Sequence, residues 1–231
     1  QKFFYSCFIQ IMIIQNNCKT AFTASKIPLQ DADWVCRKVK TAFPAISPNR
    51  LFFENPALII SNSKFNSFIS KKGNLLVQDR NDRKFLSSPF KILKEIIYSA
   101  SEHKVAHCNE FASLAEMIAR INGVKNCYRL FMENYDHTFL FICEKPIEEG
   151  FCKKNNFIID PWLGISGRVE DILMKYKNVY GKIFQFAQNE KISLKIKKPL
   201  SLNENEIKYF REKYPNLVFN SSDGHKLLSF F

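Results

Sequence analysis

Glycine and proline are scarce in this chain, and it has no long apolar run that is free of charged residues. Among 231 residues there are 7 glycines and 9 prolines, a content that excludes collagen-like and linker-like chains. No stretch of about 18 uncharged apolar residues occurs, so we expect no membrane span. Residues 3–14 are apolar but shorter, and they predict a buried strand or a short helix. With 46% hydrophobic residues, the chain can form a packed core.

The cysteines do not follow a disulfide pattern either. Seven cysteines without compact spacing indicate free thiols in a reducing compartment. The net charge is +12, and residues 1–87 hold 13 of the 34 basic residues but only 5 of the 22 acidic ones. Such a basic region favours an acidic partner, although abundant Lys, Asn, Ile and Phe also fit AT-rich coding. No RNP signature or zinc-finger spacing indicates nucleic-acid binding.

Regular apolar periodicity is clearest after residue 87. Residues 31–42 predict a helix, whereas the rest of 28–84 is irregular. Ser88 and Pro89 predict a helix start, and a second helix should run over 108–121 and end at Asn122-Gly123. Strands are predicted at 127–133, 137–143 and 157–160, followed by a loop with Gly164 and Gly167, a helix at 169–176, strands at 183–187 and 192–196, and a helix at 203–214.

This order of elements predicts an α+β fold, because two helices precede an antiparallel sheet. The shift in regularity and charge suggests two parts. We expect an N-terminal basic extension or cap at residues 1–87 and a catalytic domain at residues 88–231. The sequence leaves the oligomeric state open.

Three fragments carry residues suited to nucleophilic chemistry, namely AHCNEFASLAEMIARINGV, DHTFLFI and FIIDPWLG. Cys108 stands where the second helix should begin, and a helix N-terminus favours the thiolate form of a cysteine. His137 opens a strand that is apolar on both faces, and it can take the thiol proton. Asp160 ends the next strand and can orient the imidazole. The three residues therefore form a candidate catalytic triad.

These fragments resemble the core of the transglutaminase-like branch of the papain-like cysteine enzyme superfamily, over about residues 88–165. Members of that family order their catalytic Cys, His and Asp along the chain in this way. The resemblance implies a nucleophile helix packed on an antiparallel sheet, with Cys108, His137 and Asp160 as the triad. It also implies acyl transfer on protein amide groups through a thioester, without a cofactor. The reaction can be that of a thiol protease, a glutamine deamidase or a transglutaminase, and these residues do not choose among them.

The oxyanion hole of such an enzyme should include the backbone N–H of Cys108. For the second donor, Gln78 and Asn81 are candidates upstream. The substrate is expected to be a protein. A bacterial effector that is secreted to act on another cell is one interpretation, while the localisation stays open.

Two alternatives compete with this reading. His103 and His107 are four residues apart on a helical stretch near Cys108 and Glu110, so a zinc site is conceivable, although the HExxH pattern is absent because Lys104 follows His103. The second alternative is an inactive transglutaminase-like binding module that engages an acidic partner through its basic N-terminal region. Thiol reactivity would separate a binding module from an enzyme.

Overall fold

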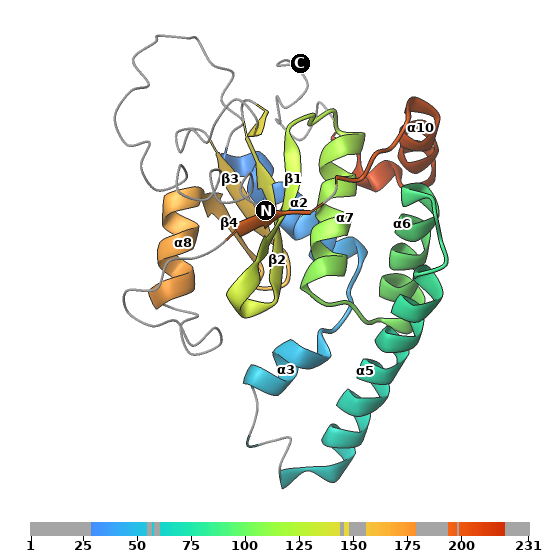
Figure 1. Cartoon of the computed structure of the whole chain (residues 1–231), viewed down its shortest axis with the longest axis vertical. Coiled ribbons are helices and arrows are strands. Elements are labelled where there is room, and N and C mark those ends of the chain that lie inside the picture. Colours follow the sequence, from blue (N-terminus) through green and yellow to red (C-terminus); the bar gives the residue numbers. More distant parts are fainter. Residues whose placement is uncertain are drawn as a thin grey trace, which may run out of the picture.

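Helices and one antiparallel sheet make up the described part of the chain (Figure 1). This computed structural model describes residues 29–54, 57, 61–143, 146, 147, 156–178, 194–197 and 199–219. Its α-helices are α2 (Leu29–Ala42), α3 (Pro48–Glu54), α5 (Ser63–Arg83), α6 (Pro89–Tyr98), α7 (Cys108–Ile121), α8 (Val169–Asn178) and α10 (Glu204–Lys213). Its strands are β1 (Cys127–Met132), β2 (His137–Ile142), β3 (Phe157–Asp160), β4 (Ile165–Arg168) and β5 (Leu194–Ile196). The predicted α+β class is confirmed, while the segments predicted at 3–14 and 183–187 lie outside the described residues.

Strand β2 occupies the centre of the sheet. The strand order is β4-β3-β2-β1-β5, and every neighbouring pair is antiparallel. All six residues of β2 are buried, as its apolar side chains on both faces predict. A 3-10 turn (Glu133–Tyr135) and the left-handed residue Asp136, with φ of 43°, connect β1 to β2. The register pairs His137 with Met132, so His137 lies at the end of the sheet where β2 begins.

Helices cover both faces of the sheet. Ser166 Oγ in β4 donates a hydrogen bond to Asp33 of α2 over 3.3 Å, whereas a Cβ on the next residue, Gly167, would lie 3.2 Å from Ile172 of α8. Because successive strand residues point to opposite faces, α2 and α8 lie on opposite faces of the sheet. Helix α7 packs against β1, β2 and α2, which places it with α2 (Figure 1).

Helix α7 is buried along almost its whole length. Its small residues Ala112, Ala115 and Ala119 have no exposed surface, so the helix backbone can approach the sheet closely. The helix stops where the sequence predicts, because Gly123 takes a positive φ of 86° that suits glycine. The buried Asn122 side chain then donates to the carbonyl of Leu217 over 2.8 Å, which ties this end to the C-terminal part of the described chain.

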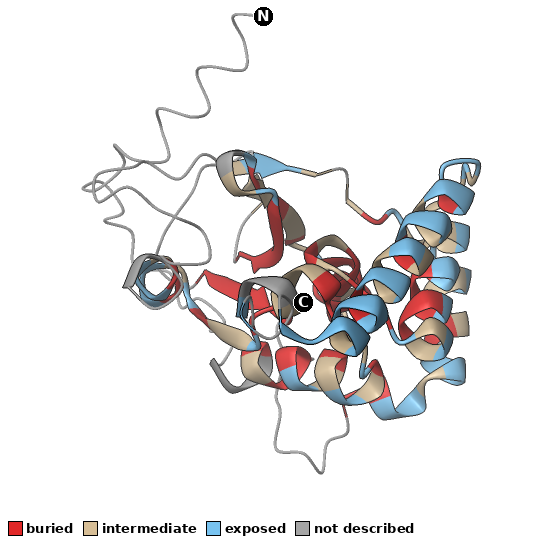
Figure 2. Cartoon of the chain, turned by 90° about the horizontal axis from the view of Figure 1, so that it is seen from below, coloured by how far each residue is buried: buried red, intermediate tan, exposed pale blue. Residues whose placement is uncertain are grey.

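Helices α5 and α6 form an outer layer beside α7 (Figure 1). Figure 2 shows the buried residues gathered in the sheet and α7, with exposed residues along the outer helices. The expectation of irregular structure before Ser88 was wrong for α5, which has 21 residues. It buries only Ile69, Leu76 and Arg83, so its sequence carries no sustained apolar stripe. Its start is fixed by Asn62, whose side chain accepts a hydrogen bond from the backbone N–H of Phe65.

The loop predicted around Gly164 and Gly167 was also wrong in part. Only residues 161–164 form a turn, in which Gly164 has a φ of 74°, and residues 165–168 continue as β4. The strand needs glycine at 167 because Ile172 of α8 packs closely above it. The predicted helix starts at Ser88 and Asn203 are confirmed, and Asn203 caps α10 by accepting from the N–H of Glu206. None of the helices in the described part combines the length and apolar character needed to cross a bilayer.

Candidate active site

Cys108 is the first residue of α7. The residue before it, His107, is extended, and its backbone N–H donates to Glu110 Oε2 over 3.2 Å, which fixes the start of the helix. The first N–H groups of a helix have no acceptor within the helix, so they present a positive field to the Cys108 side chain. That side chain is 7% exposed, and its Sγ lies 3.6 Å from the carbonyl oxygen of Asp136. The nucleophile predicted from the sequence is thus at a helix N-terminus and beside the start of β2.

His137 and Asp160 are brought together by neighbouring strands. His137 is the first residue of β2 and Asp160 the last of β3, and His137 Nε2 lies 2.7 Å from Asp160 Oδ2. The carboxylate also accepts hydrogen bonds from the Tyr176 hydroxyl over 2.9 Å and from the Leu163 N–H over 3.2 Å. Both residues of the pair are buried, at 2% and 0% exposure. The geometry fixes the orientation of the imidazole.

The surroundings of His137 favour its charged form. Burial by itself lowers the pKa of this imidazole, but the Asp160 carboxylate and a hydrogen bond with the Cys108 side chain raise the pKa to about 10. Since Nε2 is taken by Asp160, Nδ1 is the nitrogen that remains for Cys108. The structure therefore brings together all three residues predicted from the sequence, with His137 interacting with both Asp160 and Cys108.

Aromatic side chains that the sequence did not assign to the site enclose the imidazole. The ring of Trp162 has its centroid 5.0 Å from that of His137, and the ring of Tyr176 lies at 6.0 Å. Trp162 is held in place because its Nε1 donates to Ser47 Oγ over 2.6 Å. Tyr176 lies 16 residues after Asp160 in sequence, on the separate helix α8, and no local pattern marks it as a partner of the carboxylate.

A second buried cluster holds the first turn of α7. Glu110 accepts two hydrogen bonds from Arg80 of α5, over 2.9 and 2.8 Å, and one from Arg83 over 2.6 Å. Burial would raise the pKa of Glu110, but these two arginines hold it below its ordinary value. Gln78 and Asn81, the candidates for the second oxyanion donor, have exposed side chains on α5. Arg80 and Arg83 are the residues of α5 that turn toward the start of α7 here.

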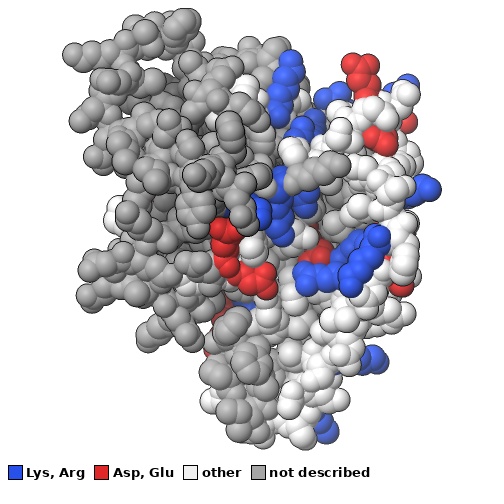
Figure 3. All heavy atoms as spheres, viewed as in Figure 1, with Lys and Arg blue, Asp and Glu red and all other residues white. Residues whose placement is uncertain are grey.

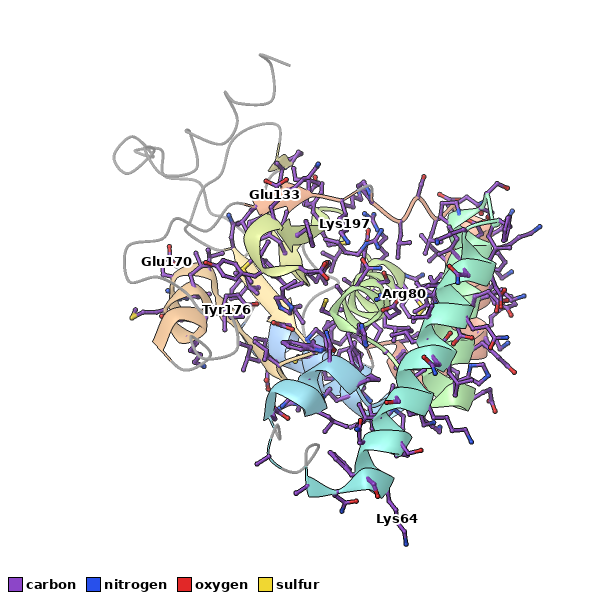
Figure 4. All side chains as sticks on the ribbon, turned by 60° about the horizontal axis from the view of Figure 1, so that its bottom comes forward. Lys64, Arg80, Glu133, Glu170, Tyr176 and Lys197 are labelled. Atoms are coloured by element: carbon purple, nitrogen blue, oxygen red, sulfur yellow. The ribbon has the colours of Figure 1, made fainter. Side chains whose placement is uncertain are left out.

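Two cations lie on the sides of the nucleophile. The first is Arg80, which reaches toward the start of α7 from α5. Figure 4 shows it on the side of α7 opposite to Tyr176. Lys197, which follows β5, donates from Nζ to Asn109 Oδ1 over 3.1 Å, next to Cys108 in the chain. Burial lowers the pKa of Lys197, and the neighbouring Cys108 side chain opposes that shift. Figure 3 shows lysine and arginine side chains gathered near the middle of the viewed face.

The residues considered for a zinc site, His103 and His107, do not form a group of metal ligands in the described part of the chain. His103 Nδ1 lies 3.0 Å from Asp79 Oδ2, while burial and Arg80 lower the pKa of His107 to about 4. Within the described ranges, no group of three or more His, Cys, Asp or Glu side chains is placed to hold a metal ion. Burial raises the pKa of the Cys36 thiol and of the Cys127 thiol to about 12.

Two of the pockets in the described residues lie near α7. The larger, of about 510 Å³, lies at the far end of α7, between Gly123 and α10, and contains none of the three site residues. The smaller, of about 230 Å³, is lined by Trp162 and Phe111, which adjoin His137 and Cys108. The smaller pocket also contains none of the three site residues, but it lies nearer to them because Trp162 packs on His137.

Comparison with known proteins finds no relative of this chain. No family model, no curated protein and no solved structure matches the chain. The case for a function consequently depends on the geometry of these side chains.

Proposed function

We propose that this protein is a cysteine-dependent acyl-transfer enzyme with a transglutaminase-like core that acts on amide groups of a protein. The observation that carries the proposal is the series Cys108–His137–Asp160, with 2.7 Å between the imidazole and the carboxylate and the thiol at the start of α7. An imidazolium beside a thiol at a helix N-terminus is the arrangement that keeps a cysteine ionised and nucleophilic.

The first half of the reaction forms a thioester. The thiolate of Cys108 attacks the amide carbon, and the charge that develops on the carbonyl oxygen is met by the N–H of Cys108, which has no acceptor within the helix. His137 then gives its proton to the leaving nitrogen as the C–N bond breaks. Asp160 keeps the imidazole in the required orientation throughout, and the hydroxyl of Tyr176 holds Asp160.

The second half releases the acyl group. A water or an amine attacks the thioester carbon, His137 takes the proton of the attacking atom, and the Cys108 sulfur leaves. Water yields proteolysis or deamidation, depending on which amide was attacked, and an amine yields a crosslink. Intact-mass measurement of candidate protein substrates with the wild type and Cys108→Ser distinguishes cleavage fragments, a gain of about 1 Da by deamidation, and amine adducts.

Alkylation of Cys108 by iodoacetamide tests the proposal without a known substrate. At pH 6 an ordinary thiol is less than about 1% ionised, whereas a thiolate paired with imidazolium remains ionised. We therefore expect His137→Gln to slow alkylation of Cys108 about 10²-fold at pH 6, with little difference above pH 9. Peptide mass spectrometry would follow each cysteine separately, and Cys36 and Cys127 serve as internal controls because burial raises the pKa of both.

An equal rate in the wild type and His137→Gln at pH 6 would contradict the proposal. It would favour the alternative of a binding module without turnover, because such a module has no need of an activated thiol. Circular dichroism of both proteins shows whether the variant is folded. The alkylation rates are compared only under conditions in which both proteins are folded.

A further inference from the structure

A pocket of about 230 Å³ is lined by Trp162 and Phe111, two residues close to the site, although none of the three site residues lines it. Its walls come from the end of α2, the segment that follows it, α3, α7 and the turn after β3. The lining residues are Lys40, Ala45, Ile46, Ser47, Arg50, Leu51, Glu54, Phe111 and Trp162. The volume corresponds to about eight waters at liquid density, which suits one short side chain and is below the size of most drug-like ligand sites.

The pocket is joined to the nucleophile by three structural links. Phe111 lies one helical turn after Cys108 on α7, and the ring of Trp162 lies against that of His137 with 5.0 Å between centroids. On the third side, Ile46 pairs with the strand-like segment that leads into α7, since Ala106 N–H donates to Ile46 O over 3.0 Å. A group bound in the pocket would therefore lie against Trp162, whose ring packs on the imidazole of His137.

Lys40 supplies a positive charge to this pocket, and the carboxylates of Glu54 and Asp160 act on it without forming an ion pair. The other cation, Arg50, is paired with Glu54 over 2.7 Å and also donates to the Trp162 carbonyl. Lys40 forms no ion pair among the described residues, and its Nζ lies 5.4 Å from the centroid of the Phe111 ring. Burial and the charge of Arg50 lower the pKa of Lys40, so a bound anion would relieve an unfavourable environment.

We infer that this pocket receives a carboxylate of the substrate, either an acidic side chain or a chain terminus near the attacked carbonyl, and that Lys40 binds it. This inference rests on the proposed function, because it treats Cys108 as the reacting group. Phe111 and Trp162 would contact the apolar stem, while Lys40 pairs with the charged end. The result is a preference for acidic sequences around the modified amide.

The test uses alkylating probes that differ only in charge. N-iodoacetyl amino acids with one, two or three methylenes before the carboxylate are each compared with the corresponding neutral N-methyl amide. In every case the Cys108 sulfur forms a bond to the iodoacetyl CH₂, and iodide leaves. Rates are measured on the full chain by mass spectrometry of the Cys108 peptide, and each is divided by the rate with free cysteine to remove intrinsic differences between probes.

For at least one spacer length, we expect the carboxylate probe to react about tenfold faster than its neutral partner in the wild type. Lys40→Met should reduce that ratio to about one, because only the charge is lost. Lys38→Met is the matched control on the same helix, since the Lys38 ammonium lies over the Trp34 ring, outside the pocket lining, and it should keep the wild-type ratio.

Equal rates for charged and neutral probes at every length in the wild type would overturn the inference, and so would a preference that persists in Lys40→Met. The rate with the neutral probes shows that Lys40→Met still folds. The same neutral probes separate this inference from the proposed function. If their rate depends on His137 while no charge preference appears, the pocket assignment alone fails; if it does not depend on His137, the proposed function fails.

Discussion

The protein buries carboxylates in two different settings, and the difference concerns what neutralises them. Glu110 and Glu116, both on α7, are each bonded to two arginines: Glu110 to Arg80 and Arg83, and Glu116 to Arg120 and Arg129. Asp160 has no arginine or lysine ion pair among the described residues. Its charged partner is His137, supported by hydrogen bonds from Tyr176 and a backbone N–H.

An arginine remains charged at any pH that a protein experiences, so the glutamate clusters cannot move a proton. A histidine can gain and lose its charge, and the carboxylate beside it then controls where the proton resides. The two glutamates therefore fix α7 in place, one at the turn that carries Cys108 and one in its middle. Asp160 is suited to chemistry because its partner can change.

The largest effect should come from breaking a glutamate cluster. Glu116→Gln leaves Arg120 and Arg129 without a counter-charge in a buried site, and we expect a loss of about 3–5 kcal/mol in the free energy of unfolding. Urea denaturation measures this. Glu212→Gln removes an exposed carboxylate, 67% accessible and 3.8 Å from Lys208, and should change stability by less than about 0.5 kcal/mol. Similar losses for both variants would mean that burial of the ion pairs does not matter.

The sequence predicts those boundaries of helices and strands that depend on local periodicity. The boundaries of α7 and β3 follow from an apolar helix ending at Gly123 and a short apolar strand ending before Pro161, and both match the structure. They fix the positions of Cys108 and Asp160 along the chain. His137 follows in the same way from the buried pattern of β2.

Contacts between distant elements could not be predicted in this way. The pairing of Arg80 with Glu110 spans 30 residues and depends on α5, whose few buried positions give no clear periodicity. Trp162 meets Ser47 across 115 residues, and nothing in either local sequence indicates the partner. The residues that carry the proposed chemistry were thus accessible from the sequence, while those that support and surround them required the fold.

An intermediate effect is expected at Asp160. Asp160→Asn keeps the size of the side chain but removes the charge that stabilises the imidazolium, so alkylation of Cys108 at pH 7 should slow about 30-fold. Unlike Glu116→Gln, the variant leaves no permanently charged group unpaired, because His137 can become neutral. Its loss of stability should therefore be smaller than that of Glu116→Gln in the same urea experiment. A variant that loses stability but alkylates at the wild-type rate would remove the distinction between the two settings.

A further effect is a change of stability with pH that arises from His137 and the groups paired with it. Its pKa in the folded state is raised to about 10 by Asp160 and Cys108 against the effect of burial, compared with about 6.5 in an unfolded chain. The folded state therefore binds the proton more tightly. The stabilisation is complete below about pH 6.5 and is lost as the pH rises toward 10.

We expect the melting temperature of the wild type to fall between pH 7 and pH 10 more steeply than that of His137→Gln, and differential scanning calorimetry in matched buffers measures the two slopes. His107 provides a control of opposite sign within the same site. Burial and Arg80 lower its pKa to about 4, so its contribution to stability is lost as the pH falls from about 6.5 toward 4. His107→Gln should therefore flatten the acid side of the curve and leave the slope between pH 7 and pH 10 unchanged. If His137→Gln and the wild type have parallel slopes above pH 7, the imidazole does not carry the charge that the thiolate pair requires.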